Sequence, residues 1–171
     1  MAAALNAFMQ IDGAEGESRQ GGYEKWIEIQ SWDWEVEAET SWTKGGGASV
    51  GKPSPGKMNW EHYWDRSSAT LLGYICTGSA FASVKMHMCK SIGKDKPALF
   101  FSVLMKEVFI TKVNQSATEE GNVSQKVEMV FKEIDIEYFQ QGMDKHNPGA
   151  LKQATKFHWE IPAGKASPGA P

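Results

Sequence analysis

Few residues of this chain have the types and spacing that catalysis or metal binding requires. The four histidines are His62, His87, His146 and His158, and no two have the i, i+4 or His-x-His spacing of a local metal site. A metal cluster could therefore be assembled only by the fold. His87 and Cys89 lie on one face of a predicted strand, but nothing near them resembles an oxyanion-forming turn. These residues predict no metal ion and no cofactor.

Hydrolytic and nucleotide-binding motifs are also incomplete. Ser102 and Ser124 lack the G-x-S-x-G context of an activated serine. Segment 46–52 fits the first seven positions of a phosphate-binding loop, but Pro53 stands where a Ser or Thr should ligate magnesium. Pro53 and Pro55 also prevent the helix that would face the phosphate. Paired catalytic carboxylates stay open, since a sheet can bring any two together. A hydrolase of unknown type therefore remains a third hypothesis.

Tryptophan is frequent, with seven in 171 residues. Six fall within the first 64 residues: Trp26, Trp32, Trp34, Trp42, Trp60 and Trp64. Exposed tryptophans would form a platform for stacking against sugars. Buried tryptophans would anchor the core and subunit interfaces, because the indole removes a large apolar area from water. We favour the second interpretation, and keep a carbohydrate-binding β-domain as the alternative.

Length and composition predict one folded domain without a membrane span or a general nucleic-acid partner. A chain of 171 residues has the usual size of a single domain. Its 18 basic and 21 acidic residues give a net charge of −3, whereas nucleic-acid binders normally carry a clustered basic excess. No apolar run approaches the ~20 residues that span a bilayer. Cys76 and Cys89 are too few for a disulfide scaffold, and we expect two buried free thiols.

The period-two alternation of apolar residues predicts strands along most of the chain. In 24–36 the apolar phase changes near 30–31, and in 127–138 it changes at 132–133. A one-residue slip of this kind usually marks a β-bulge, which bends a sheet toward closure. Segment 99–113 is apolar in both phases, which predicts a strand covered on both faces by the core and by a helix or another subunit.

One helix is predicted between Asp65, a natural N-cap, and Gly78, a natural C-terminal stop. Its expected core face consists of Ala69, Leu72, Ile75 and Cys76.

Two segments rich in glycine and proline complete the expected architecture. Segment 44–57 predicts an extended, exposed loop, because neither a helix nor a central strand tolerates its composition. The tail 162–171 is expected to be disordered. The fold prediction is mainly β: a β-barrel of curled antiparallel sheets with one flanking helix, in a single domain over 1–161.

Six segments, in the right order, resemble the Hcp family (haemolysin co-regulated protein) of the bacterial type VI secretion system. They are the opening strand with its Gly-Glu-Ser turn in 8–18, the strand with the W-x-W pattern in 27–34, the Gly-rich lysine-bearing loop 44–57, the L-x-K-E-V strand 104–108, the bulged run 127–138, and Phe157-His158-Trp159. Together they span roughly residues 5–161.

The resemblance implies a structural role and not an enzyme activity. Family members form hexameric rings that stack into a hollow tube inside a contractile sheath, and a spike protein caps the tube. They also bind small effectors in the ring lumen. The implied partners are thus five further copies, stacked rings, the sheath, the spike and secreted effectors. Assembly in the bacterial cytoplasm and export through the type VI apparatus fit an N-terminus without the charged start of a signal peptide.

The resemblance also implies roles for four residues. Lys44, Lys52 and Lys57 in or next to the extended loop would meet acidic groups of the next ring. Neighbouring side chains on a strand point to opposite faces, so Asp33 would project away from the core if Trp32 and Trp34 pack inward.

In the resembled family, the residue between these two tryptophans faces the channel and influences effector retention. Six copies of Asp33 would then favour basic cargo. The alternative is that Asp33 pairs with a lysine of a neighbouring strand or faces solvent outside the ring.

Overall fold

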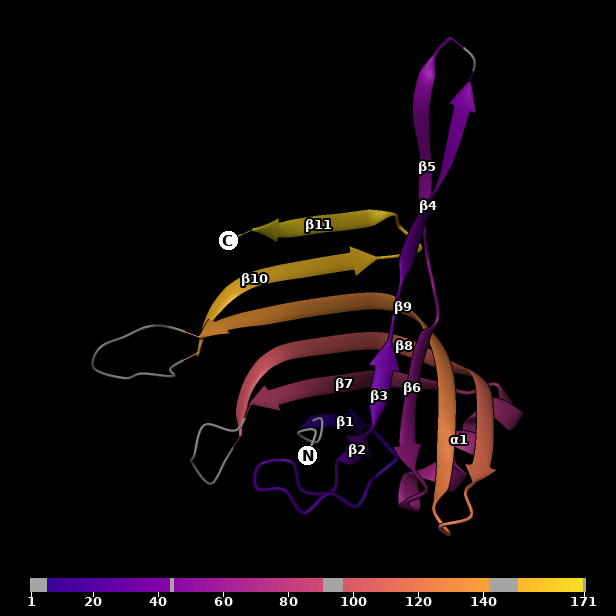
Figure 1. Ribbon diagram of the computed structural model, residues 1–171, viewed down its shortest axis with the longest axis vertical. Coiled ribbons are helices and arrows are strands. Elements are labelled where there is room, and N and C mark those ends of the chain that lie inside the picture. Colours follow the sequence, from indigo (N-terminus) through magenta and orange to yellow (C-terminus); the bar gives the residue numbers. More distant parts are fainter. Residues whose placement is uncertain (1–5, 44, 91–96, 142–150, 171) are drawn as a thin grey trace, which may run out of the picture.

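Strands make up most of the protein in a computed structural model, which describes residues 6–43, 45–90, 97–141 and 151–170 (Figure 1). The elements are β1 (Ala7–Ile11), β2 (Ile27–Ile29), β3 (Ser31–Asp33), β4 (Val36–Thr43), β5 (Gly47–Pro55), β6 (Met58–Tyr63), α1 (Arg66–Thr77), β7 (Ala80–Lys90), β8 (Ala98–Ala117), β9 (Val123–Gln141), β10 (Leu151–Glu160) and β11 (Lys165–Ala170). Within the described ranges, no helix has the length and apolar character needed to cross a membrane.

Nine strands form one antiparallel sheet that curls around a shared core (Figure 1). Its ladders run in the order β11-β10-β9-β8-β7-β1-β2, and β6 pairs with both β9 and β3. Strand β2, at one end of this path, comes close to β6 at Gln30, whose amide donates to the carbonyl oxygen of Glu61 over 2.8 Å. The predicted β class is confirmed. The predicted barrel is not closed, because no ladder among the described residues joins β2 to β6.

The phase change predicted at 30–31 marks the place where the chain changes its pairing partner. Ile27 and Ile29 in β2 are buried and pair with β1. Beyond Gln30, β3 pairs with β6, and Trp32 packs against the core from the opposite phase. Residues 27–33 can therefore pair with β1 through β2 and with β6 through β3, while their apolar side chains stay packed against the core.

The long hairpin of β8 and β9 bends sharply in its middle (Figure 1). The buried phase changes in both strands at the same place, from Met105 to Val108 in β8 and from Phe131 to Ile134 in β9. The pairing register stays constant across the change, with Met105 opposite Ile134 and Val108 opposite Phe131. The bulge predicted at 132–133 is therefore a bend that two paired strands share without a change of register.

At this bend, two outward-facing residues of β8 form ion pairs with two outward-facing residues of β9. Glu107 has a φ of 48°, in the left-handed region that non-glycine residues rarely occupy. Lys132 pairs with Glu107, and Lys106 pairs with Glu133 at 2.7 Å. Exposed ion pairs contribute about 1 kcal/mol or less each, so the buried side chains on either side are the main restraint on the bend.

Helix α1 begins and ends where the sequence predicts. The Asp65 carboxylate accepts a hydrogen bond from the Ser67 amide at 2.8 Å, and the Ser68 hydroxyl accepts one from the Asp65 amide at 3.0 Å. This reciprocal capping box satisfies amides that the first turn would otherwise leave unpaired. Gly78 ends the helix with a φ of 67°.

The face of α1 that packs against the sheet is only partly the predicted one, because Ile75 packs against the core as expected. Leu71 and the two serines of the first turn are buried, whereas Ala69 and Cys76 are exposed. The expectation of a buried thiol is wrong for Cys76 and confirmed for Cys89. The apolar spacing missed the true face because the sheet under the first turn presents polar groups, which small hydroxyl side chains can meet.

Those polar groups form a buried network centred on Gln125 and His62, both of which are fully buried. The amide nitrogen of Gln125 donates to the carbonyl oxygen of Ser68 at 3.3 Å and to Oε1 of Gln115 at 3.0 Å. Its Oε1 is therefore the atom that accepts from Nε2 of His62, at 2.7 Å. The network ties β6, β8 and β9 to the start of α1.

The segment predicted as a loop, 44–57, belongs instead to a two-stranded hairpin of β4 and β5 (Figure 1). The segment is exposed, as expected, but it is not irregular. Pro53 pairs with Ala38, and Pro55 pairs with Val36. Each strand of a two-stranded ribbon has one edge without a ladder, where the missing N–H of proline costs no hydrogen bond.

The tail also differs from the expectation of disorder over 162–171. The chain turns at Gly164, whose amide donates to the carbonyl oxygen of Ile161 at 3.1 Å. Strand β11 then pairs with β10, with Lys165 opposite Glu160. Because β11 is the edge strand of the sheet, its proline- and glycine-rich composition is compatible with pairing on one side.

We expect Asp65→Ala to lower the free energy of unfolding by about 1–2 kcal/mol at neutral pH, because it removes the cap of α1. Burial opposes ionisation of Asp65, but interactions with His62 and Ser67 outweigh it and hold its pKa below the usual value. A lowered folded pKa gives stability that is present above the unfolded pKa of about 4 and is lost as the pH falls through the folded pKa. Urea titrations should therefore show that the difference in free energy of unfolding between Asp65→Ala and the wild type becomes smaller in acid.

Glu120→Ala, in an exposed turn, is the matched control. An equal loss of unfolding free energy in that variant would contradict the capping role of Asp65.

Candidate interaction surfaces

Trp34 anchors the β4–β5 hairpin to the curled sheet. Its indole nitrogen donates to the carbonyl oxygen of Gly56 at 3.1 Å. Its ring packs against Phe131 and Trp159, with ring centroids 5.7 and 6.5 Å away. A Cβ on Gly56 would lie 2.8 Å from the carbonyl oxygen of Glu35, so the base of the hairpin closes only around glycine. These contacts fix the direction in which the hairpin leaves the sheet.

The hairpin projects from the body and presents large apolar side chains to solvent (Figure 1). Trp42 is 81% exposed and Val50 is 70% exposed. Single exposed apolar residues are ordinary, but a tryptophan at the far part of a projecting ribbon adds nothing to the core of its own chain. We call the β4–β5 hairpin, residues 36–55, the arm. It has the character of a docking element, since tryptophans that become buried on binding are frequent anchors of protein interfaces.

The three lysines predicted to lie in a stacking loop occupy different environments. Lys52 is exposed on β5. Lys57 lies beyond the hairpin, just before β6, and pairs with Glu128 of its own chain at 3.3 Å. Lys44 falls outside the described residues. Of the two described lysines, only Lys52 therefore lies on the arm itself.

Asp33 projects from β3 away from the core, while Trp32 and Trp34 pack against the core. Its carboxylate accepts a hydrogen bond from Nδ2 of Asn59 at 3.1 Å. The predicted alternation is thus confirmed. This contact is with an amide of the neighbouring strand, where one alternative had named a lysine. The other alternative, that Asp33 faces solvent outside the ring, stays a prediction.

Asp33 lies in an open polar groove of about 390 Å³ across β3, β6, β9 and β8. The charged side chains of this groove are Asp33, Glu61, Glu128, Lys112 and Lys126. We call this depression the Asp33 groove. Its three carboxylates and two ammonium groups give it a mildly acidic balance, so it is not a uniform acidic ring.

The tryptophans do not assemble a sugar platform. Trp60 and Trp159 are buried, and Trp26, Trp32 and Trp34 are partly buried and pack against core clusters. Trp42 lies on β4 of the hairpin, whereas Trp64 directly follows Tyr63, the last residue of β6.

His87 and Cys89, the candidate nucleophile pair, are linked through the hydroxyl of Tyr23. That hydroxyl is 3.3 Å from Nδ1 of His87 and 3.1 Å from the sulfur of Cys89. Burial raises the pKa of the Cys89 thiol and lowers the pKa of His87, so both groups are held neutral. A neutral buried thiol is a poor nucleophile, and the arrangement is that of a packed polar cluster.

The curled sheet, the single helix and the anchored arm agree with one family. The family model for the type VI secretion system effector Hcp matches residues 8–138. The chain belongs to the Hcp family. No curated protein matches it significantly.

Several solved structures share this fold over almost their full length. Hcp1 from Salmonella typhimurium is 25% identical, with a TM-score of 0.76 over 96% of this chain and 99% of that one. A type six secretion system protein is 21% identical, with a TM-score of 0.84 over 96% and 100% of the two chains. A type VI secretion system effector from Yersinia pestis is 22% identical, with a TM-score of 0.69 over 91% and 99%.

Two of the Hcp-like motifs have a direct structural reason in this chain. A Cβ on Gly16 would lie 2.4 Å from the carbonyl oxygen of Trp26, so the Gly-Glu-Ser turn closes only around glycine. The amides of Gly16 and Ser18 donate across this turn to the carbonyl oxygens of Lys25 and Trp26. The L-x-K-E-V run contains the β8 side of the bend, where Glu107 takes its left-handed conformation.

Sequence reasoning does not single out Trp42 and misses Asn59. Trp42 falls among the tryptophans predicted to anchor the core or an interface, although its position beside a glycine-rich segment separates it from them. Asn59 gave no signal, because its contact with Asp33 depends on the pairing of β3 with β6.

Proposed function

We propose that this protein is a structural tube subunit of the type VI secretion system. In this proposal it is not an enzyme: six copies form a ring, the rings stack into a hollow tube inside the contractile sheath and under the spike, and the lumen holds effectors. The tube assembles in the bacterial cytoplasm and leaves through the apparatus. The observation that carries the proposal is the match to the Hcp family over 8–138, in a chain that presents an anchored, projecting arm.

Surface composition supports an assembled form. Apart from the arm, large apolar side chains are exposed where β6 ends and β9 begins: Tyr63 is 53% exposed, and Trp64 and Val123 are each 42% exposed. Trp64 and Val123 are joined by a backbone hydrogen bond, so their residues are neighbours. A ring of identical subunits would cover such a patch through a heterologous interface that closes on itself.

The first test is the mass of the purified protein. Light scattering at micromolar concentration and moderate salt should give six times the 18.9 kDa of one chain. A carbohydrate-binding domain has no need to form a ring. A monomer under these conditions would contradict the proposal and favour that alternative.

The arm is proposed to join one ring to the next. Trp42→Ala removes its largest exposed apolar side chain, and deletion of 45–56 removes the whole of β5. Both changes should leave rings intact and reduce tube formation, by tenfold or more in sedimented polymer for the tryptophan variant, because interface tryptophans often dominate binding energy.

Ser41→Ala, on the same strand, is the matched control for Trp42 and should polymerise normally. Tubes of normal length from the deletion variant would refute this role. Loss of folding in that variant, seen by circular dichroism, would show that the arm belongs to the core fold instead.

Asp33 is proposed to face the lumen and to influence cargo retention. Replacing it with arginine reverses the charge at six places in the ring, so co-purification of basic effectors should fall several-fold while ring mass is unchanged. Retention of wild-type cargo should also weaken in high salt, because exposed charges are screened beyond ~8 Å at physiological ionic strength. Glu120→Arg is the matched charge control on an exposed turn. Unchanged cargo binding by the Asp33 variant would refute the role.

A further inference from the structure

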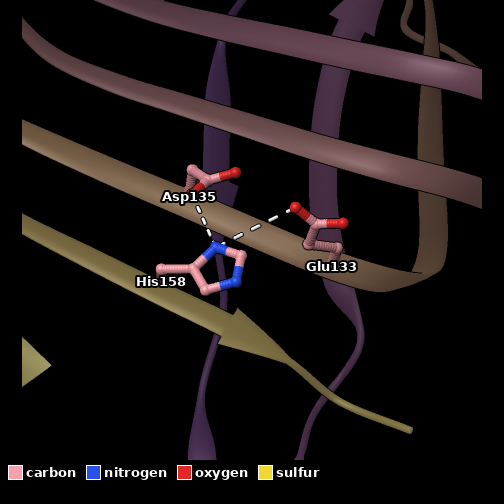
Figure 2. A group of neighbouring side chains, drawn as sticks. All are labelled: Glu133, Asp135 and His158. Atoms are coloured by element: carbon pink, nitrogen blue, oxygen red, sulfur yellow. Dashed lines mark hydrogen bonds and ion pairs between the residues drawn. The ribbon is translucent and has the colours of Figure 1, made fainter. Parts of the chain in front are cut away.

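Three side chains that could ligate a metal ion meet on the outward side of β9 and β10 (Figure 2). Glu133 and Asp135 project from β9, and His158 projects from β10. Nδ1 of His158 is 2.7 Å from Oδ1 of Asp135 and 3.9 Å from Oε1 of Glu133. One ligand atom from each residue lies within 4.8 Å of the other two. The cluster is half-buried, with 26–41% of each side chain exposed.

The strands hold these side chains in place. Asp135 and His158 are directly opposite each other in the β9–β10 ladder. Each ligand residue is next to an inward-facing one: Ile134 is fully buried between the two carboxylates, and Trp159 is buried beside the histidine. The ligands therefore stand on rigid, core-anchored strands, which is the condition for a preorganised site.

We propose that Glu133, Asp135 and His158 bind a divalent transition-metal ion such as Zn²⁺. One imidazole and two carboxylates suit ions of borderline hardness, and water would complete the coordination on the exposed side. Metal–ligand bonds of about 2.0–2.2 Å place the ligand atoms of a tetrahedral site about 3.4 Å apart. Small side-chain rotations bring the observed separations to that value.

The lysine beside the cluster supports this assignment and adds a competitor. Nζ of Lys106 is 2.7 Å from Oε1 of Glu133, the same oxygen that faces His158. The carboxylate of Glu133 thus already pairs with one cation at this place. The Lys106 side chain is 47% exposed, so it can swing into solvent when a metal ion replaces it.

Metal binding also requires a defined change in His158. Without metal, Nδ1–H donates to Asp135; with metal, Nδ1 offers its lone pair and the proton is carried by Nε2. This exchange occurs through solvent, because the imidazole is partly exposed. A metal-bound imidazole is neutral, so the ion would add its charge to the two carboxylates with no imidazolium beside it.

The test is isothermal titration of the full chain with Zn²⁺, with Co²⁺ absorption as a spectroscopic report of nitrogen and oxygen ligands. We expect one site per chain. His158→Gln and Asp135→Asn should each weaken binding at least tenfold, since they delete a ligand. Lys106→Met should strengthen binding several-fold, since it removes the competing cation. The three substituted side chains, His158, Asp135 and Lys106, are each partly exposed. Circular dichroism checks that the variants fold.

Glu137→Gln is the matched control, because Glu137 is the next outward residue of β9 and pairs with Lys156 at 2.9 Å. It should bind Zn²⁺ like the wild type. Absence of Zn²⁺ binding by the wild type would overturn the proposal. An equal loss in the Glu137 and Asp135 variants would also overturn it, because general surface charge would then explain the binding. Ring mass is measured in parallel, so failure of this site is distinguishable from failure of the tube proposal.

Discussion

The shared bend of β8 and β9 is the constraint on which the rest of this fold depends. These strands stay in register while both reverse which side chains face inward, from Met105 to Val108 and from Phe131 to Ile134. The ladder can therefore turn a corner, with Met105 opposite Ile134 and Val108 opposite Phe131, without exposing its apolar phase. Before the bend β9 pairs with β6, and after it with β10, so one hairpin joins both halves of the curled sheet.

The bend of β8 and β9 positions three candidate surfaces: the arm, the Asp33 groove and the cluster of Glu133, Asp135 and His158. Phe131, at the bend, supports Trp34, and Trp34 in turn holds the base of the β4–β5 arm. The part of β9 before the bend forms one wall of the Asp33 groove, and the part just after it carries Glu133 and Asp135. An error of one residue in this ladder would move all three surfaces at once. That shared dependence explains why an arm with little core of its own still has a fixed direction.

Local patterns in the sequence predicted what local physics decides. The caps of α1, the β class and the outward direction of Asp33 follow from Asp65, Gly78 and the alternation around Trp32 and Trp34. Predictions failed where distant pairing decides the outcome. Residues 47–55 form a strand because β4 lies beside them, and the first turn of α1 packs on a buried polar network that no apolar spacing reveals. The contact of Asp135 with His158 similarly exists only because β9 and β10 are in register.

The central claim is that this Hcp fold presents its arm and its groove to other copies of itself. Electron cryomicroscopy of the purified, assembled protein tests it most directly, because one map locates both surfaces. We expect six-fold rings in which the Asp33 groove lies on the wall of the lumen and the β4–β5 arm reaches into the adjacent ring. Rings with the groove on the outer wall and the arm free in solvent, or particles without six-fold symmetry, would contradict it.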